Sequence, residues 1–149
     1  MAKKLSAQLA SLQSTAAALN ELCNNGAEIV RGLEDFLSTE CSIGIEASVL
    51  LSDNSDEYAC RQKRLCYGRL GDRFRVYLQW YDSSDPPHNE YSVKLWAECK
   101  REDKIATIPL LVDLVQAIDA EAQARLDSAK QAFEAIGALS KAKKPGAKG

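Results

Sequence analysis

Residues 73–81 read RFRVYLQWY, and in this stretch Phe74, Val76, Leu78 and Trp80 alternate with basic, amide and tyrosine side chains. A period of two residues is that of a β-strand, because successive side chains of a strand point to opposite faces of the sheet. Only one of these sets can lie against a core, and we expect the apolar set to do so. The stretch therefore predicts a strand with one buried face and one open face.

Three more strands are predicted around this one. Strand spacing recurs before and after it, at residues 43–51, 58–70 and 91–99. Short turn sequences and a loop at residues 82–89 connect them, so the simplest topology is an antiparallel four-stranded meander. In the last strand we expect one set of alternating residues on the apolar face: Tyr91, Val93, Leu95, Ala97 and Cys99.

A long helix is predicted before the sheet. Apolar or small residues recur in steps of four and three, which is a heptad seam: Leu5, Leu9, Leu12, Ala16, Leu19, Cys23, Gly26, Val30, Leu33 and Leu37. The triplet Asn24-Asn25-Gly26 resembles a helix stop, yet the seam keeps its phase across it. We therefore expect one helix to about Ser38, weakened or kinked at Gly26, and the alternative is two shorter helices.

A second long helix is predicted after the sheet. Thr107 is suited to be its N-cap, and Pro109 would lie in its first turn. Its apolar stripe contains Leu111, Val115, Ile118, Ala122, Leu126, Ala129, Phe133 and Ile136. We expect this helix to end near Leu139, so that residues 1–140 form a single α+β domain and the Lys-rich residues 141–149 form a disordered tail.

The meander predicts how the two helices are arranged. The first and last strands of a four-stranded meander run in opposite directions, so we expect the helices to be antiparallel neighbours on one sheet face. Each helix would extend ~15 to 20 Å past the strands, given the rise per residue of helices and strands. The overhanging seam, represented by Leu9, Leu12, Leu126 and Phe133, then predicts a protein partner or a second copy of the chain. The alternative is a monomer whose first helix bends at Gly26 and wraps the sheet.

The open face of the sheet is a second candidate surface. We expect it to carry basic and aromatic side chains together: Arg73, Arg75, Tyr77, Tyr81, Lys94 and Trp96. Sheets with such faces hold single-stranded nucleic acid, and an acidic protein is a further possible ligand. The same residue types also stabilise a solvated sheet through pairs of side chains on neighbouring strands.

Signals for catalysis and for metal binding are absent from the sequence. The single histidine, His88, lies in a predicted loop, and the five cysteines show no C-x-x-C pair. We expect no catalytic residue, no cofactor, no metal and no small-molecule substrate. The cysteines are interpreted as free, buried thiols in a reducing compartment, which together with the lack of an apolar run near ~18 residues predicts a cytoplasmic protein without membrane contact.

The sequence therefore predicts a non-enzymatic interaction module, such as an adaptor, an inhibitor or a subunit of a complex, and a homodimer joined through its helices. The alternative is a nucleic-acid-binding accessory protein that uses the open sheet face. The near-neutral composition, with a formal net charge of -2, hides a basic segment at residues 61–75, which carries six basic residues and one acid.

Overall fold

The computed structural model describes residues 2–42, 44–83 and 90–143, and it contains a sheet with a long helix before it and another after it. The helices are α1 (Ala2–Asp35), α2 (Arg101–Thr107) and α3 (Leu110–Lys143), and a π-helical turn, η1 (Phe36–Glu40), follows α1. The strands are β1 (Ala47–Asp53), β2 (Arg61–Leu70), β3 (Arg73–Asp82) and β4 (Glu90–Leu95), and a 3-10 turn, η2 (Trp96–Glu98), follows β4. The predicted α+β fold class is confirmed.

The four strands form one antiparallel sheet in the order β1-β2-β3-β4, which confirms the predicted meander. Gly71 has a positive φ of 67° in the turn between β2 and β3, a backbone conformation that glycine adopts without a steric penalty. The first strand begins at Ala47 and not at residue 43, which lies outside the described residues. The last strand ends at Leu95 and not at Cys99.

The register of β4 differs from the prediction. Leu95 is paired with Tyr77 and Lys94 with Leu78, so Lys94 lies on the same face as the apolar side chains of β3. The apolar residues of β4 consequently share the open face with Tyr77 and Tyr81. This register lets the chain leave β4 at Leu95 and direct the next residue, Trp96, into the core, where it is 1% exposed.

The core lies between one sheet face and the two long helices. A single cluster of buried side chains joins all of these elements: Val30, Leu37, Leu65, Tyr67, Val76, Leu78, Trp96, Cys99, Leu111, Leu114 and Ile118. Trp96 lies where several elements meet, and its Nε1 donates a 2.7 Å hydrogen bond to Thr107 Oγ1, which is fully buried. That bond removes the penalty of burying both polar groups.

Helix α1 is continuous through Gly26, as the phase of the seam predicted. A Cβ atom at Gly26 would lie 3.0 Å from the Trp96 ring and 3.3 Å from Ile108. The glycine is therefore explained by the close approach of these side chains to α1, and not by a helix stop.

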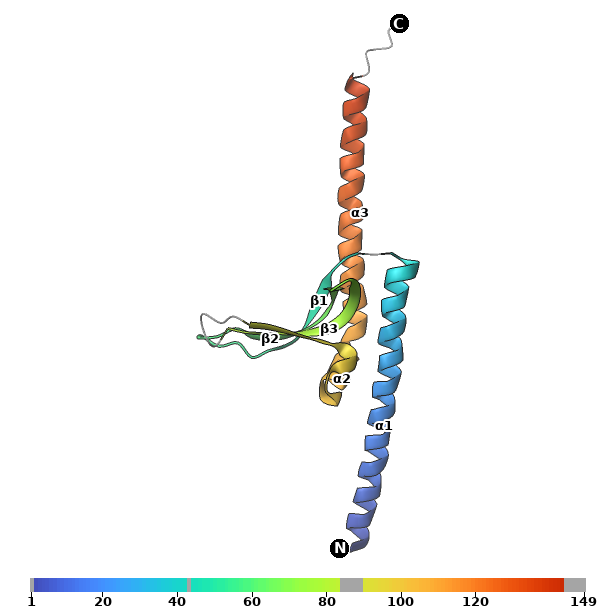
Figure 1. Ribbon diagram of the computed structural model, residues 1–149, viewed down its shortest axis with the longest axis vertical. Coiled ribbons are helices and arrows are strands. Elements are labelled where there is room, and N and C mark those ends of the chain that lie inside the picture. Colours follow the sequence, from blue (N-terminus) through green and yellow to red (C-terminus); the bar gives the residue numbers. More distant parts are fainter. Residues whose placement is uncertain (1, 43, 84–89, 144–149) are drawn as a thin grey trace.

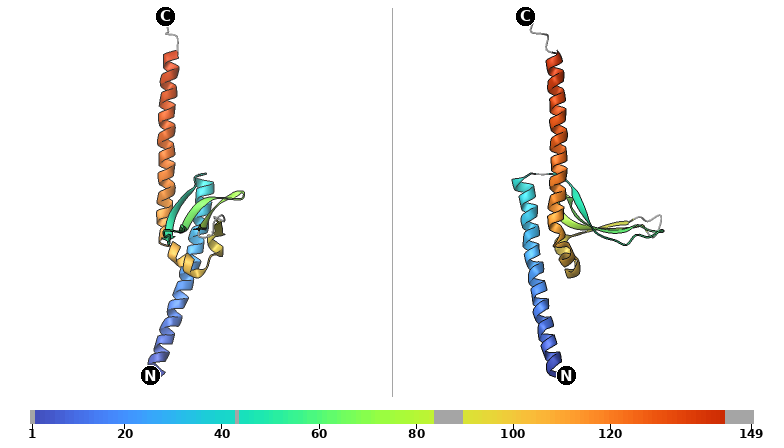
Figure 2. Two further views of the ribbon diagram at one scale, coloured as in Figure 1. Left: turned by 90° about the vertical axis from the view of Figure 1, so that its left-hand side faces the viewer. Right: turned by 180° about the vertical axis from the view of Figure 1, so that it is seen from behind.

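The two long helices run in the same direction, and the predicted antiparallel arrangement is wrong (Figures 1 and 2). Figure 1 shows that the helices cross the strands steeply and do not follow them. The direction of a strand therefore does not determine the direction of the helix connected to it. In addition, η2 and α2 stand between β4 and α3 and allow the chain to turn before the long helix begins.

The start and end of α3 also differ from the prediction. Thr107 is the last residue of α2, and α3 begins at Leu110, directly after Pro109. The helix continues past Leu139 to Lys143, and the rest of the predicted tail lies outside the described residues. The predicted N-cap was misplaced because Thr107 serves the core, where it bonds Trp96 and donates to the Lys104 carbonyl.

Candidate interaction surfaces

The two long helices each project beyond the sheet, at opposite ends of the molecule (Figure 1). We call residues 2–22 the α1 arm and residues 119–143 the α3 arm. Every described side chain of the α1 arm is at least partly exposed, and the same holds in the α3 arm up to Lys141. Among the described residues, tertiary packing therefore buries no side chain of the α1 arm and none of the α3 arm up to Lys141.

The heptad seam of the first helix is buried in its C-terminal half and exposed in the α1 arm. Cys23, Gly26, Val30 and Leu37 are buried against the sheet and its connections. The same stripe continues toward the N-terminus in steps of four and three residues. Its side chains there are largely exposed, with exposed fractions of 57% for Leu5, 56% for Leu9 and 64% for Leu12. Because the phase is unchanged, these leucines lie on the same side of the helix as the buried residues.

The α3 arm repeats this pattern at the other end. Leu111, Leu114 and Ile118 are buried at the sheet. Beyond them the stripe continues as exposed side chains: Leu126 (47%), Phe133 (81%) and Ile136 (65%). The four seam residues predicted from the sequence thus all lie on surfaces that the described part of the chain leaves uncovered: Leu9, Leu12, Leu126 and Phe133.

The six residues predicted for the open sheet face do not form one surface. Trp96 is buried in the core, and the register puts Lys94 on the opposite face of the sheet from Tyr77. Arg75 is held by Glu34 of α1. Arg73 is exposed at the start of β3, and Tyr81 is partly exposed and lies beside Tyr91, with ring centroids 4.7 Å apart.

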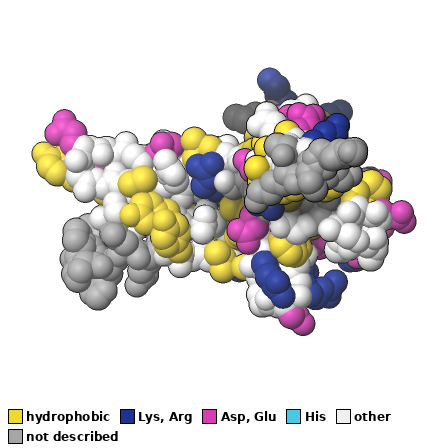
Figure 3. All heavy atoms as spheres, turned by 90° about the horizontal axis from the view of Figure 1, so that it is seen from above, with side chains coloured by type: hydrophobic (Ala, Val, Ile, Leu, Met, Phe, Trp, Pro, Cys, Tyr) yellow, Lys and Arg dark blue, Asp and Glu magenta, His cyan; other side chains and the backbone are white. Residues whose placement is uncertain are grey.

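Apolar side chains occupy part of the open face where basic ones were predicted. Tyr91 and Val93 are 65% and 49% exposed. Seen along the long axis of the molecule, apolar side chains are visible over the sheet as well as around the helices (Figure 3). Arg64 of β2 is paired with Leu50 of β1, and its Nε donates a hydrogen bond to Ser48 Oγ on that neighbouring strand. The face is therefore less basic than the sequence of β2 and β3 indicated.

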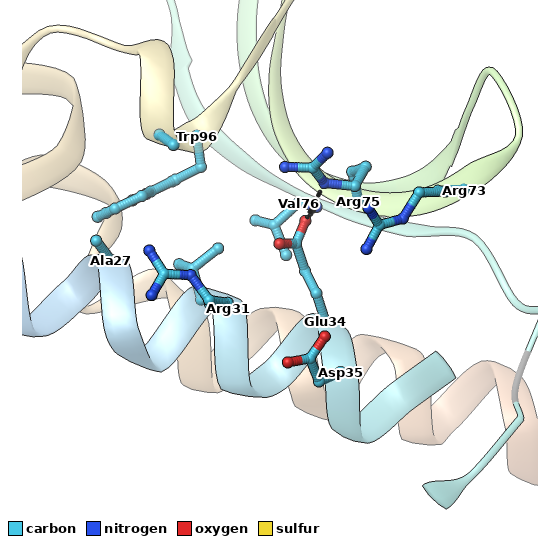
Figure 4. A pocket seen from close by; sticks show the side chains of 10 residues that line it. Ala27, Arg31, Glu34, Asp35, Arg73, Arg75, Val76 and Trp96 are labelled. Carbon is cyan, nitrogen blue, oxygen red and sulfur yellow. Dashed lines mark hydrogen bonds and ion pairs between the residues drawn. The ribbon is translucent and has the colours of Figure 1, made fainter. Parts of the chain in front are cut away.

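A cleft of about 330 Å³ lies between the C-terminal half of α1 and the start of β3 (Figure 4). At its centre, Glu34 Oε2 accepts a 2.9 Å hydrogen bond from Arg75 Nε and a 2.7 Å bond from the Val76 backbone N–H. The pairing of β3 with β4 stops at Tyr77, so the Glu34 carboxylate takes the position of an acceptor on a neighbouring strand. Sequence reasoning missed this contact because its partners are 41 and 42 residues apart and no local pattern links them.

The cleft has a mixed charge and an internal ion pair. Figure 4 shows Arg31 and Arg73 on either side of Glu34, and Asp35 also lines the cleft. Tyr67 of β2 is fully buried, and burial, with smaller effects of Glu34 and Cys41, raises the pKa of its hydroxyl. We assign no ligand to this cleft, because its acidic side chains neutralise part of the positive charge of its arginines.

Within residues 2–42, 44–83 and 90–143, no group of three or more His, Cys, Asp or Glu side chains is arranged to hold a metal. In that same part of the chain, no helix has the length and apolar composition required to cross a membrane. His88 lies outside the described residues. All five cysteines are free; Cys23, Cys66 and Cys99 are buried, and Cys41 and Cys60 are partly exposed.

Comparison with known proteins yields no match to a family model, to a curated protein or to a solved structure. The surfaces described above are therefore interpreted from their own geometry.

Proposed function

We propose that the protein is a non-enzymatic interaction module that self-associates through its arms, and that its partner on these arms is a second copy of the chain. The observation that supports this most directly is the exposure of the seam on both arms, with Leu12 at 64% and Phe133 at 81%. Exposed apolar stripes of this extent on soluble chains mark interaction sites. A role as an adaptor, an inhibitor or a subunit of a larger complex is compatible with such a module.

Three properties of the arms favour a second copy as the partner. The two seams have the same steps of three and four residues, so each arm presents a complementary surface to the other. The α1 arm carries only Lys3, Lys4 and Glu21 as charged residues. The α3 arm balances four acids against four bases: Asp119, Glu121, Asp127 and Glu134 against Arg125, Lys130, Lys141 and Lys143. Two copies can therefore approach without strong charge repulsion.

The apolar area is sufficient for a dimer of moderate affinity. Fully burying a side chain such as Leu or Phe contributes about 1.5–3 kcal/mol. Two copies bring together two sets of Leu5, Leu9, Leu12, Leu126, Phe133 and Ile136, which are about half exposed or more. Their burial contributes on the order of 10–20 kcal/mol, against an association cost of at least ~4 kcal/mol. A micromolar dissociation constant needs a net ~8 kcal/mol.

Sedimentation equilibrium of the full chain between about 1 and 100 μM tests the proposal. We expect the mass to approach twice that of the chain, and the double variant Phe133→Lys/Ile136→Lys to shift the equilibrium toward monomer. Gln131→Lys is the matched control, because it adds the same kind of charge on the opposite side of α3. A wild-type protein that stays strictly monomeric at about 100 μM contradicts the proposal.

Nucleic-acid binding through the open sheet face is not proposed as a second function. Three of the six residues predicted for it are not available there: Arg75 is engaged by Glu34, Lys94 lies on the opposite face, and Trp96 is buried. Binding of this kind depends on cations and exposed rings that track one strand together.

A further inference from the structure

The directions of the arms restrict how two copies can cover each other. The α1 arm and the α3 arm extend from the sheet toward opposite ends of the molecule, while both helices run in the same direction (Figures 1 and 2). Closed two-fold dimers are by far the commonest assemblies of identical chains. A two-fold axis perpendicular to the helices turns the second copy upside down, so that its α3 arm points the same way as the first copy's α1 arm.

We infer that self-association is heterotypic: the α1 arm of each copy packs antiparallel on the α3 arm of the other. This inference rests on the proposed self-association and adds which surfaces meet. A pairing of two α1 arms alone would leave both α3 arms exposed, and a pairing of two α3 arms alone would leave both α1 arms exposed. The heterotypic two-fold dimer covers all four arms at once.

The spacing of the two seams fits an antiparallel pairing over most of each arm. In the α1 arm the steps from Leu9 are three, four and three residues, and the α3 arm read backward from Ile136 has the same steps. One register then aligns four layers: Leu9 with Ile136, Leu12 with Phe133, Ala16 with Ala129, and Leu19 with Leu126. The arms of 21 and 25 residues are also similar in length, at about 32 and 38 Å by the helical rise.

A parallel, head-to-tail pairing is the competing arrangement, because it too joins an α1 arm to an α3 arm. It does not close, so it adds copies without limit. The two arrangements differ in charge. The antiparallel register brings Lys4 beside Lys141 of the other copy, whereas the parallel alignment of the seams brings Lys4 beside Glu121. Raising the salt concentration screens either contact, so it should strengthen the closed dimer slightly and weaken the head-to-tail chain.

Mixing two arm variants tests the inference. The first variant, Leu9→Lys/Leu12→Lys, disables the α1 arm, and the second, Phe133→Lys/Ile136→Lys, disables the α3 arm. In the heterotypic dimer each variant alone has a damaged member in both helix pairs, so we expect each to dissociate at least ~100-fold more readily than the wild type. An equimolar mixture retains one undamaged pair and should form a heterodimer, which native mass spectrometry identifies by its mass.

The controls Ser14→Lys and Gln131→Lys carry the same kind of new charge on the opposite sides of the two arms and should leave the wild-type dimer intact. Because the four substituted apolar side chains are exposed, circular dichroism should show an unchanged fold in both variants.

The other outcomes are distinct. If one variant alone stays dimeric, like arms pair with like arms and the inference is wrong, although self-association stands. If the wild type grows in mass without limit as its concentration rises, the pairing is head-to-tail and the closed dimer is wrong. If the wild type is monomeric throughout, the proposed function itself fails.

Discussion

The two halves of α1 carry one seam but have opposite surroundings. From Cys23 to Leu37 the seam is packed against Trp96, the sheet and the start of α3, whereas from Leu5 to Leu12 it meets no other part of the described chain. The difference between the halves is therefore not in the helix. The sheet and its connections extend along the C-terminal half of the helix only, so they cover the seam there and leave the N-terminal half exposed. A heptad seam specifies that a helix has a partner, but it does not specify whether the partner belongs to the same chain.

The junction of helices and sheet also differs from the projecting parts in its polar contacts. At the junction, Glu34 bonds Arg75 and the Val76 backbone, and the side chains of Glu34 and Arg75 are only 12% and 29% exposed. At the far end of the sheet, Arg61 pairs with Asp56 and Asp82 through side chains that are 43% to 54% exposed. Matched substitutions in the two regions can therefore test how much of the stability resides at the junction.

The largest difference is expected between two leucines of α3. Leu114 is fully buried and Leu126 is 47% exposed. We expect Leu114→Ala to lower the free energy of unfolding by about 2–5 kcal/mol, because it removes buried contacts and leaves a cavity. Leu126→Ala should change it by less than about 0.5 kcal/mol under conditions where the chain is monomeric. Urea denaturation followed by circular dichroism measures both, and equal losses would contradict the distinction between junction and arm.

The buried thiol of Cys66 should react more slowly than a partly exposed thiol, because the reactive thiolate fraction falls as burial raises the pKa. Burial raises the pKa of the Cys66 thiol from 9.0 to about 11, with a smaller contribution of the same sign from Glu46 that is opposed by Arg64. Cys60, just before β2, is partly exposed. We expect iodoacetamide at about pH 8, near the ordinary thiol pKa, to modify Cys60 early and Cys66 late, with all five cysteines modified after unfolding.

Mass spectrometry of the alkylated peptides resolves each site over time. Modification of Cys66 as fast as that of Cys60 would show that this part of the sheet is open to solvent. A disulfide in the native protein would contradict the assignment of five free thiols.

The ion pairs should differ by a smaller amount. Glu34→Ala removes an acceptor shared by Arg75 and the Val76 N–H, and we expect a loss of about 2 kcal/mol because hydrogen bonds to charged groups are among the stronger ones. Arg61→Ala should lose less than about 1 kcal/mol, as exposed ion pairs do. Urea denaturation midpoints of both variants, measured at the same protein concentration, test this expectation. A larger loss of stability in Arg61→Ala than in Glu34→Ala would contradict it.

The smallest difference is expected between two glycines of α1. Replacing glycine by alanine within a helix gains about 1 kcal/mol when the new methyl group meets nothing. A Cβ atom at Gly32 would have no neighbour within 4 Å, so Gly32→Ala should gain that amount. Gly26→Ala should gain less or lose stability, because its methyl group would lie 3.0 Å from the Trp96 ring. Equal gains in thermal unfolding would show that Trp96 does not approach α1 this closely.

Several features of the structure could be predicted because they depend on residues close together in the chain. The alternation in residues 73–81 predicted β3, and the heptad spacing predicted that α1 passes through Gly26 without a break. The exposed seam residues could be named for the same reason, since a stripe on a helix follows from its period alone.

Other features depended on contacts between distant parts of the chain, and these features could not be predicted from the sequence. The register of β4, the burial of Trp96 against Thr107 and the bond of Glu34 to Val76 join residues that no local pattern connects. The helix directions were mispredicted because the helices cross the strands rather than follow them. The sequence by itself determined the type of each main element and, for β3 and the two long helices, the face that is buried, because periodicity is a local property of the backbone. Only the tertiary structure decided which part of each seam is covered, because coverage depends on where the neighbouring elements end in space.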